Sequence, residues 1–301
     1  MMMRGGGRLN RFFFLFWFSF FSTIIPRGVQ RLFTLTIGNL FYFLMARARA
    51  GVLANLQVIG GGRLSRGEIA ALARRTFQNY GQYLLDYMVM PGLSAEHKGR
   101  MVARELGQGH MVRSIKQGKG VICITPHLGN WELGGLLLAF RGAELYVLTL
   151  DEIDSQTKAF REQMRGRKGI KNIYINPADP TPAAIIEIVK VLKEKKVVAM
   201  LGDRPENTNT IEVTFFGRKT RFPRGVATLA MATGAAVLPV FVVLKKGKYW
   251  GIIERPIYFA STARKEREQV IKEGMQELAR VFERYIKEYP DQWYNFYPYW
   301  S

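Results

Sequence analysis

The chain has 301 residues, of which 48% are hydrophobic, and a single cysteine, Cys123. This length and apolar content suffice for a sizeable buried core and exclude an intrinsically disordered protein, and one cysteine excludes an intramolecular disulfide. Lys and Arg number 44 against 24 Asp and Glu, so the net charge of +20 predicts attraction to a polyanion, whether nucleic acid, an anionic membrane surface or an acidic protein.

The first 50 residues predict a membrane anchor. Residues 12–25 read FFFLFWFSFFSTII and carry no charge, and a second apolar segment follows at 32–45. The first segment is shorter than the roughly 20 residues that cross a bilayer as a straight helix. We therefore expect a span with a following interfacial helix, and a folded domain over 51–301. A cleaved signal peptide is one alternative, although no small-x-small cleavage site is present. A buried core helix is the other.

The next segment predicts a long helix. Gly60-Gly61-Gly62 breaks the chain, and Ser65 with Glu68 then forms a capping-box signature for a helix that runs towards Met90. Pro91-Gly92 ends it.

From about residue 120, short apolar runs alternate with helical patterns. Strands are expected at 121–125, 145–150, 173–175, 197–201, 236–244 and 249–254, and helices at 131–140, 182–193, 225–233 and 264–289. Strands that alternate with helices predict an α/β fold with a mainly parallel sheet flanked by helices. In such sheets, ligands bind at the carboxyl ends of the strands.

The segment Pro126–Glu132 follows the first of these strands directly. His127 stands at the strand end, and Glu132 comes five residues later at the start of a helix, with Gly129 between them for a chain reversal. A carboxylate on one ring nitrogen fixes the imidazole tautomer and leaves the other nitrogen as a base. That pair can take a proton from a hydroxyl without a serine or cysteine nucleophile and without a metal. The alternative is a purely structural His–Glu pair.

The segment HLGNWE resembles the His-x-x-x-x-Asp/Glu motif of the lysophospholipid acyltransferase superfamily. Its GNWE ending resembles one branch, which holds the lauroyl and myristoyl acyltransferases of lipid A biosynthesis and related bacterial acyltransferases of glycolipid mannosides. Further segments are similar to that branch in the same order: 54–56 with 74–80, 200–204 with 215–217, 222–230 with 233–240, and 290–293. Pro-Arg-Gly at 223–225 departs from the Pro-Glu-Gly of glycerol-3-phosphate acyltransferases, which argues against a glycerol-phosphate acceptor.

The resemblance implies an acyltransferase domain over 51–301, with His127 as general base and Glu132 as its orienting carboxylate. It implies an acyl carrier protein as donor, a lipid A precursor or related glycolipid as acceptor, and no cofactor or metal. The expected location is the bacterial inner (cytoplasmic) membrane, with the catalytic domain facing the cytoplasm. The alternative enzyme uses acyl-CoA and a lysophospholipid, mannoside or amino-lipid acceptor. A non-catalytic lipid-binding protein is less well supported, and nucleic-acid binding rests on charge alone.

Two further groups of residues are candidates for contacts with the substrates. Backbone amides near Gly129 and Asn130 could stabilise an oxyanion, although Asn130 could equally be only a helix N-cap. Asp203 and Arg204 follow the strand at 197–201 and could contact the acceptor. Their alternative is an internal Asp–Arg salt bridge.

The remaining candidates are more distant in sequence. Arg161 and Arg165 could hold phosphates of the acceptor, because a guanidinium matches phosphate geometry. The alternative is an exposed basic helix face. Glu254 ends a strand and is a candidate substrate contact. Trp293 and the aromatic residues after it are expected at the membrane interface.

Overall fold

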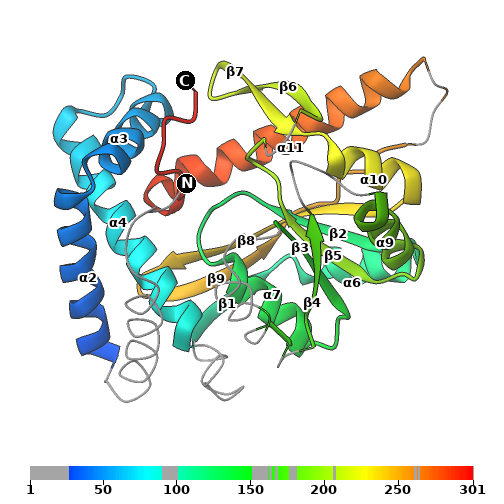
Figure 1. Ribbon diagram of the computed structural model, residues 1–301, viewed down its shortest axis with the longest axis horizontal. Helices are drawn as coiled ribbons and strands as arrows, with labels where there is room; N and C mark the ends of the chain where they lie inside the picture. The colour runs from blue at the N-terminus through cyan, green and yellow to red at the C-terminus, as the bar shows by residue number, and fades with distance from the viewer. Residues whose placement is uncertain are drawn as a thin grey trace.

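The computed structural model describes residues 27–89, 101–150, 162, 165–166, 169–175, 182–205, 208–260, 263 and 265–300. A central sheet lies between two layers of helices, and an N-terminal group of helices packs at one end (Figure 1). The expected anchor residues 1–26 and Arg161 lie outside the described residues.

Seven strands form the central sheet in the order β1-β9-β8-β2-β5-β3-β4. They are β1 (Val102–Leu106), β2 (Val121–Thr125), β3 (Leu145–Leu150), β4 (Lys171–Ile175), β5 (Val197–Leu201), β8 (Ala236–Lys245) and β9 (Lys248–Ile253). Strands β8, β2, β5, β3 and β4 are mutually parallel, whereas β9 runs antiparallel to β8. The predicted α/β fold with a mainly parallel sheet is confirmed.

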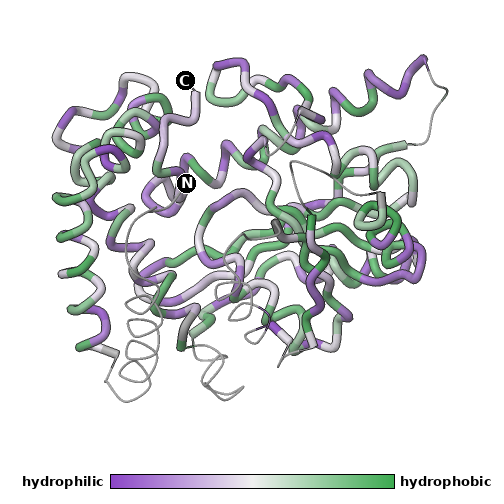
Figure 2. The backbone as a smooth tube through the Cα atoms, viewed as in Figure 1, coloured by the Kyte–Doolittle hydropathy of each residue, from purple (hydrophilic) through white to green (hydrophobic). Residues whose placement is uncertain are grey.

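Helices cover both faces of this sheet, because its strands bury side chains on both sides. Helices α6 (Gln108–Lys116) and α7 (Trp131–Phe140) share one apolar core with Cys123 of β2. Helices α9 (Pro182–Lys193), α10 (Gly225–Thr233) and α11 (Arg267–Glu288) share a second core with Ile124 of β2. Figure 2 shows the hydrophobic residues concentrated along the central strands between these layers.

The N-terminal helices are α2 (Arg27–Leu44), α3 (Ala46–Gly60) and α4 (Arg66–Val89). The predicted capping box opens α4, since Ser65 N donates to Glu68 Oε2 at 2.8 Å and Glu68 N donates to Ser65 Oγ at 3.3 Å. Helix α2 packs closely on α4 at Gly38, where a Cβ would lie 2.6 Å from the Gln78 Cα. Among the described residues, no helix is both long enough and apolar enough to cross a membrane.

Several elements were not predicted. They are strand β1, helix α6, the two-stranded hairpin of β6 (Thr210–Phe215) and β7 (Arg218–Pro223), and the short helix η2 (Pro290–Gln292). The chain after η2 runs back into the core instead of to a membrane interface. Trp293 is 3% exposed and Tyr299 is 9% exposed, so the expected interfacial position of Trp293 is wrong.

Candidate active site

The loop after β2 reverses sharply at Gly129. This residue has a φ of 66°, and a Cβ there would lie 2.0 Å from the carbonyl oxygen of Val242. Only glycine fits both the left-handed backbone and this close approach. The reversal places Asn130 as the N-cap of α7, where its Oδ1 accepts from the Leu133 amide at 3.0 Å. The capping alternative for Asn130 is therefore the one that the structure shows.

His127 is held by a carboxylate from the neighbouring strand. Its Nδ1 lies 2.6 Å from Oδ1 of Asp203, which follows β5 and is fully buried. Burial alone would raise the pKa of Asp203, but the charge and hydrogen bond of His127, with Arg204 and Trp293, hold it well below its ordinary value. Asp203 is thus a buried carboxylate that fixes the ring of His127.

This geometry corrects the expected partner of His127. The Glu132 carboxylate binds the Arg165 guanidinium in a bidentate pair, with Nη2–Oε1 at 2.6 Å and Nε–Oε2 at 3.2 Å. Glu132 lies in the first turn of α7, whereas Asp203 stands at the strand end beside His127 and contacts Nδ1. Arg165 is 6% exposed, so the alternative that it lies on an exposed basic helix face is wrong.

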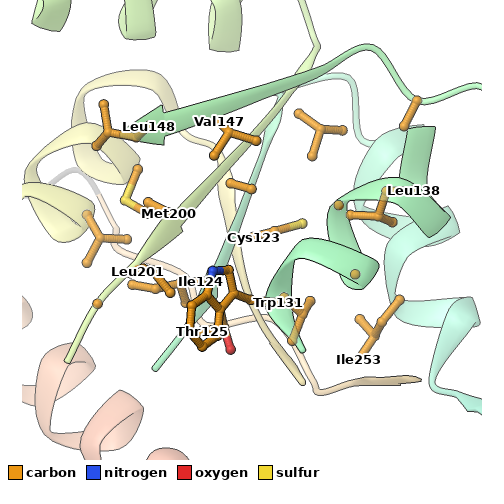
Figure 3. Close-up of a pocket in the computed structure, with 18 of the residues that line it drawn as sticks. Cys123, Ile124, Thr125, Trp131, Leu138, Val147, Leu148, Met200, Leu201 and Ile253 are labelled. Carbon is orange, nitrogen blue, oxygen red and sulfur yellow. The ribbon is translucent and has the colours of Figure 1, made fainter. Parts of the chain in front are cut away.

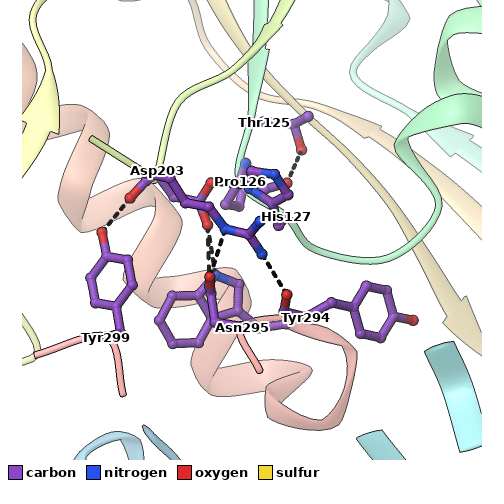
Figure 4. A network of polar contacts seen from close by, with 9 residues as sticks. Thr125, Pro126, His127, Asp203, Tyr294, Asn295 and Tyr299 are labelled. Atoms are coloured by element: carbon purple, nitrogen blue, oxygen red, sulfur yellow. Dashed lines mark hydrogen bonds and ion pairs between the residues drawn. The ribbon is translucent and has the colours of Figure 1, made fainter. Parts of the chain in front are cut away.

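The segment after η2 completes the surroundings of Asp203. Trp293 Nε1 donates to Asp203 Oδ2 at 2.9 Å, and the Tyr299 hydroxyl donates to the Asp203 carbonyl. The Tyr294 amide donates to the His127 carbonyl at 2.8 Å. Figure 4 shows Tyr294, Asn295 and Tyr299 gathered around Asp203 and His127. Sequence reasoning missed these contacts, although the 290–293 motif was a signal for them.

The other predicted contacts have structural partners. Arg204 donates to Asn295 Oδ1 at 2.7 Å and to the Tyr294 carbonyl at 2.5 Å. Glu254 accepts from the Tyr285 hydroxyl and forms an ion pair with Arg284 at 2.7 Å, both on α11. Arg204 lines the cavity described below, and Glu254 anchors the end of β9 to α11.

The two amides expected at an oxyanion site are already hydrogen-bonded. Gly129 N donates to the Gln292 carbonyl at 2.9 Å, and Asn130 N donates to the Val242 carbonyl at 2.7 Å. They are not oriented for a ligand, which corrects that expectation. The first helical amides of α7, of Trp131 and Glu132, belong to the set that a helix leaves without intrahelical partners.

A cavity of about 1430 Å³ opens beside these residues. His127, Trp131, Glu132, Arg165 and Arg204 line it together with many apolar side chains. Figure 3 shows Cys123, Val147, Met200 and Leu138 around this space, from strands β2, β3 and β5 and from helix α7. A base at the wall of an apolar cavity suits a reaction on a long apolar substrate.

Comparisons with known proteins agree with this chemistry. A family model described as bacterial lipid A biosynthesis acyltransferase matches residues 8–301. A phosphatidylinositol mannoside acyltransferase of Mycobacterium tuberculosis (strain H37Rv) is 26% identical over 227 residues, which cover 75% of this chain and 69% of that protein. The protein of the same name from Mycolicibacterium smegmatis is 25% identical over 230 residues, covering 76% and 72%.

Proposed function

Because the chain belongs to the bacterial lipid A biosynthesis acyltransferase family and is an acyltransferase, we propose that it moves a fatty acyl chain from a thioester donor to a glycolipid hydroxyl, with His127 as base. The observation that carries the proposal is the buried pair of His127 Nδ1 and Asp203 Oδ1, 2.6 Å apart, at the wall of the cavity. Asp203 is the positioning carboxylate in this scheme.

The pair performs general base catalysis in two proton transfers. With Nδ1 hydrogen-bonded to Asp203, Nε2 accepts the proton of the acceptor hydroxyl as its oxygen attacks the thioester carbonyl. The resulting oxyanion is stabilised by the first amides of α7 and by the positive end of that helix. When the carbon–sulfur bond breaks, the departing thiolate takes the proton back from Nε2. An ester and a free thiol result.

The acceptor that we propose is a mannoside of a phospholipid. The support is that the curated relatives, which match about three quarters of this chain, are named phosphatidylinositol mannoside acyltransferases. A lipid A precursor is the second candidate, which the family description favours. The donor that we propose is an acyl carrier protein, since an acidic carrier is attracted to a chain of net charge +20. Acyl-CoA is its alternative.

We further propose that the enzyme acts at the cytoplasmic face of a bacterial inner membrane. Helix α2 exposes a row of large apolar side chains, among them Leu32 at 65%, Phe43 at 62% and Leu44 at 68% exposure. Exposed apolar side chains of this density are typical of a membrane or protein contact. The uncharged segment 12–25 precedes α2 in the sequence.

The test is acyl transfer by the purified full chain in detergent. Radiolabelled acyl carrier protein and acyl-CoA are each offered with a phosphatidylinositol mannoside and with a tetra-acylated lipid A precursor. Transfer to the mannoside supports the proposed acceptor. Transfer to the lipid A precursor alone would show that the precursor, and not the mannoside, is the acceptor. Absence of transfer in all four combinations, from a protein with a cooperative unfolding transition, would overturn the proposed substrates.

A further inference from the structure

A second buried carboxylate, besides that of Asp203, lies on helix α4. Asp86 is 9% exposed, and α4 runs from the N-terminal group of helices past one end of the central sheet (Figure 1). Oδ1 of Asp86 accepts a hydrogen bond from Gln82 Nε2 at 3.1 Å, and Oδ2 accepts one from the hydroxyl of Tyr249, in β9, at 2.5 Å. An apolar side chain would avoid the cost of burying a carboxylate, which favours a role for Asp86 beyond stability.

Tyr249 presents an acceptor to the side away from Asp86. The side chain is buried, at 4% exposure, and its hydroxyl has one hydrogen, which it donates to Asp86. The lone pairs of the phenol oxygen therefore remain available to accept. Burial raises the pKa of Tyr249 well above its ordinary value, and the charge and hydrogen bond of Asp86 raise it further. The phenol thus stays protonated at neutral pH and keeps donating to Asp86.

The side-chain amide of Asn130 lies beside this acceptor. Asn130 is fully buried, and its Oδ1 accepts from the Leu133 amide, so Nδ2 is the side-chain atom with hydrogens to donate. Nδ2 has no hydrogen bond of ordinary geometry to the described residues, but the amide is near enough to the Tyr249 hydroxyl to lower its pKa as a donor does. A phenol whose hydrogen is turned to Asp86 attracts Nδ2 and repels Oδ1. The phenol therefore favours the orientation in which Oδ1 caps α7.

The orientation of Asn130 decides how the first turn of α7 is held. With the amide reversed, Nδ2 would meet the Leu133 N–H, donor against donor, and the N-cap would be lost. The next two residues, Trp131 and Glu132, carry the helix-end amides that stabilise the oxyanion in the proposed function. Helix α4 also packs on this turn directly, since the rings of Tyr83 and Trp131 have centroids 4.5 Å apart. Helix α4 thus reaches the turn both by polar contacts and by ring packing.

We propose that Asp86 and Tyr249 are positioning residues for acyl transfer: together they hold the Asn130 amide in its capping orientation and thereby direct the first amides of α7 at the reaction centre. Neither side chain lines the cavity, so both act through Asn130. This assignment rests on the proposed function and extends it. Asp203 orients the base from β5, and Asp86 orients the oxyanion donors from α4.

Two tyrosine variants form a matched comparison. Tyr249→Phe keeps the ring and removes the hydroxyl that contacts Asp86. Tyr285→Phe makes the same change elsewhere, because Tyr285 of α11 is 8% exposed and its hydroxyl donates to the carboxylate of Glu254. Each variant loses one contact between a buried phenol and a carboxylate. Of the two phenols, that of Tyr249 is the one beside Asn130.

The first readout is the rate of acyl transfer. Tyr249→Phe should lower kcat about tenfold or more, because misdirected amides stabilise the oxyanion less, and should leave the KM for donor and acceptor little changed. Tyr285→Phe should keep the wild-type kcat. Asp86→Asn should resemble Tyr249→Phe, and the double variant should be little slower than the slower single variant, since both changes break one chain of contacts. A wild-type kcat in Tyr249→Phe, or an equal loss in the two tyrosine variants, would overturn the proposal.

Amide hydrogen exchange of the free enzyme tests the same chain of contacts without any substrate. The fragment that covers 126–138 contains the Leu133 amide, which opening of the N-cap exposes to exchange. Exchange in this fragment should be faster in Tyr249→Phe than in the wild type and in Tyr285→Phe. That result would support the positioning role even if no glycolipid were turned over. Exchange at the wild-type rate in Tyr249→Phe would show that the hydroxyl does not hold the cap, and the proposal would be wrong whatever the substrates are.

Discussion

Nδ1 of His127 lies 2.6 Å from Oδ1 of Asp203, although the two residues are far apart in the chain. The register of the sheet explains their meeting. Thr125, the last residue of β2, is paired with Leu201, the last residue of β5. His127 comes two residues after Thr125, and Asp203 comes two residues after Leu201. Adjacent parallel strands that end together therefore place a base and its orienting carboxylate at one edge of the sheet.

The acid stability of the protein should depend on Asp203. Its pKa is held below the unfolded value near 3.9, so its stabilising effect is present above about pH 4 and is lost as pH falls towards the lower folded pKa. Asp203→Asn should be less stable than the wild type at pH 7, and the difference should narrow below pH 4. Urea unfolding at pH 7, 5, 4 and 3 measures this, and a difference that stays constant over the series would contradict it.

The Glu132–Arg165 pair should behave as a coupled buried pair. Their side chains are 12% and 7% exposed. Glu132→Gln or Arg165→Met alone leaves a charge buried without its partner, so each should cost about 3–5 kcal/mol of unfolding free energy. Glu132→Gln with Arg165→Met should cost clearly less than the sum of these two single changes.

An exposed ion pair provides the control for these three variants of the buried pair. Lys219 and Glu212 have exposed fractions of 80% and 56%, so Glu212→Gln should change the unfolding free energy by no more than about 0.5 kcal/mol. Additive effects of the two buried changes would show that Glu132 and Arg165 are not coupled.

The reversal at Gly129 should tolerate no side chain. Gly129→Ala must place a Cβ 2.0 Å from the Val242 oxygen while φ stays positive. Gly142→Ala has a similar φ of 82° but nothing within 4 Å of the Cβ, so it measures the backbone cost alone, about 1–2 kcal/mol. The melting temperature of Gly129→Ala should fall well below that of Gly142→Ala. Equal melting temperatures would mean that the close approach to Val242 does not constrain the loop.

The single thiol should be inert in the native protein. Burial raises the pKa of Cys123 to about 12, so almost no thiolate is present at pH 8. Reaction with a maleimide should be slow in buffer and rapid in guanidinium. Equally fast labelling in both solutions would show that the cavity wall at Cys123 is open to solvent.

The sequence predicted those elements whose apolar pattern is continuous. The bounds of β2, β5, α7 and α10 agree with the structure because each is a mainly apolar run ended by glycine, proline or a cap. Strand β1 reads VAREL and buries no side chain fully, so no pattern marked it. The partner of His127 was misassigned because spacing along the chain favours Glu132, whereas Asp203 approaches through strand pairing.

The most direct test of the base role is the rate of acyl transfer to a glycolipid acceptor, compared between the wild type, His127→Ala and Asp203→Asn, each with a cooperative unfolding transition. His127→Ala should lower kcat by about 100-fold or more, and Asp203→Asn should lower it by a smaller factor. Transfer by folded His127→Ala at the wild-type rate would contradict the assignment of the base.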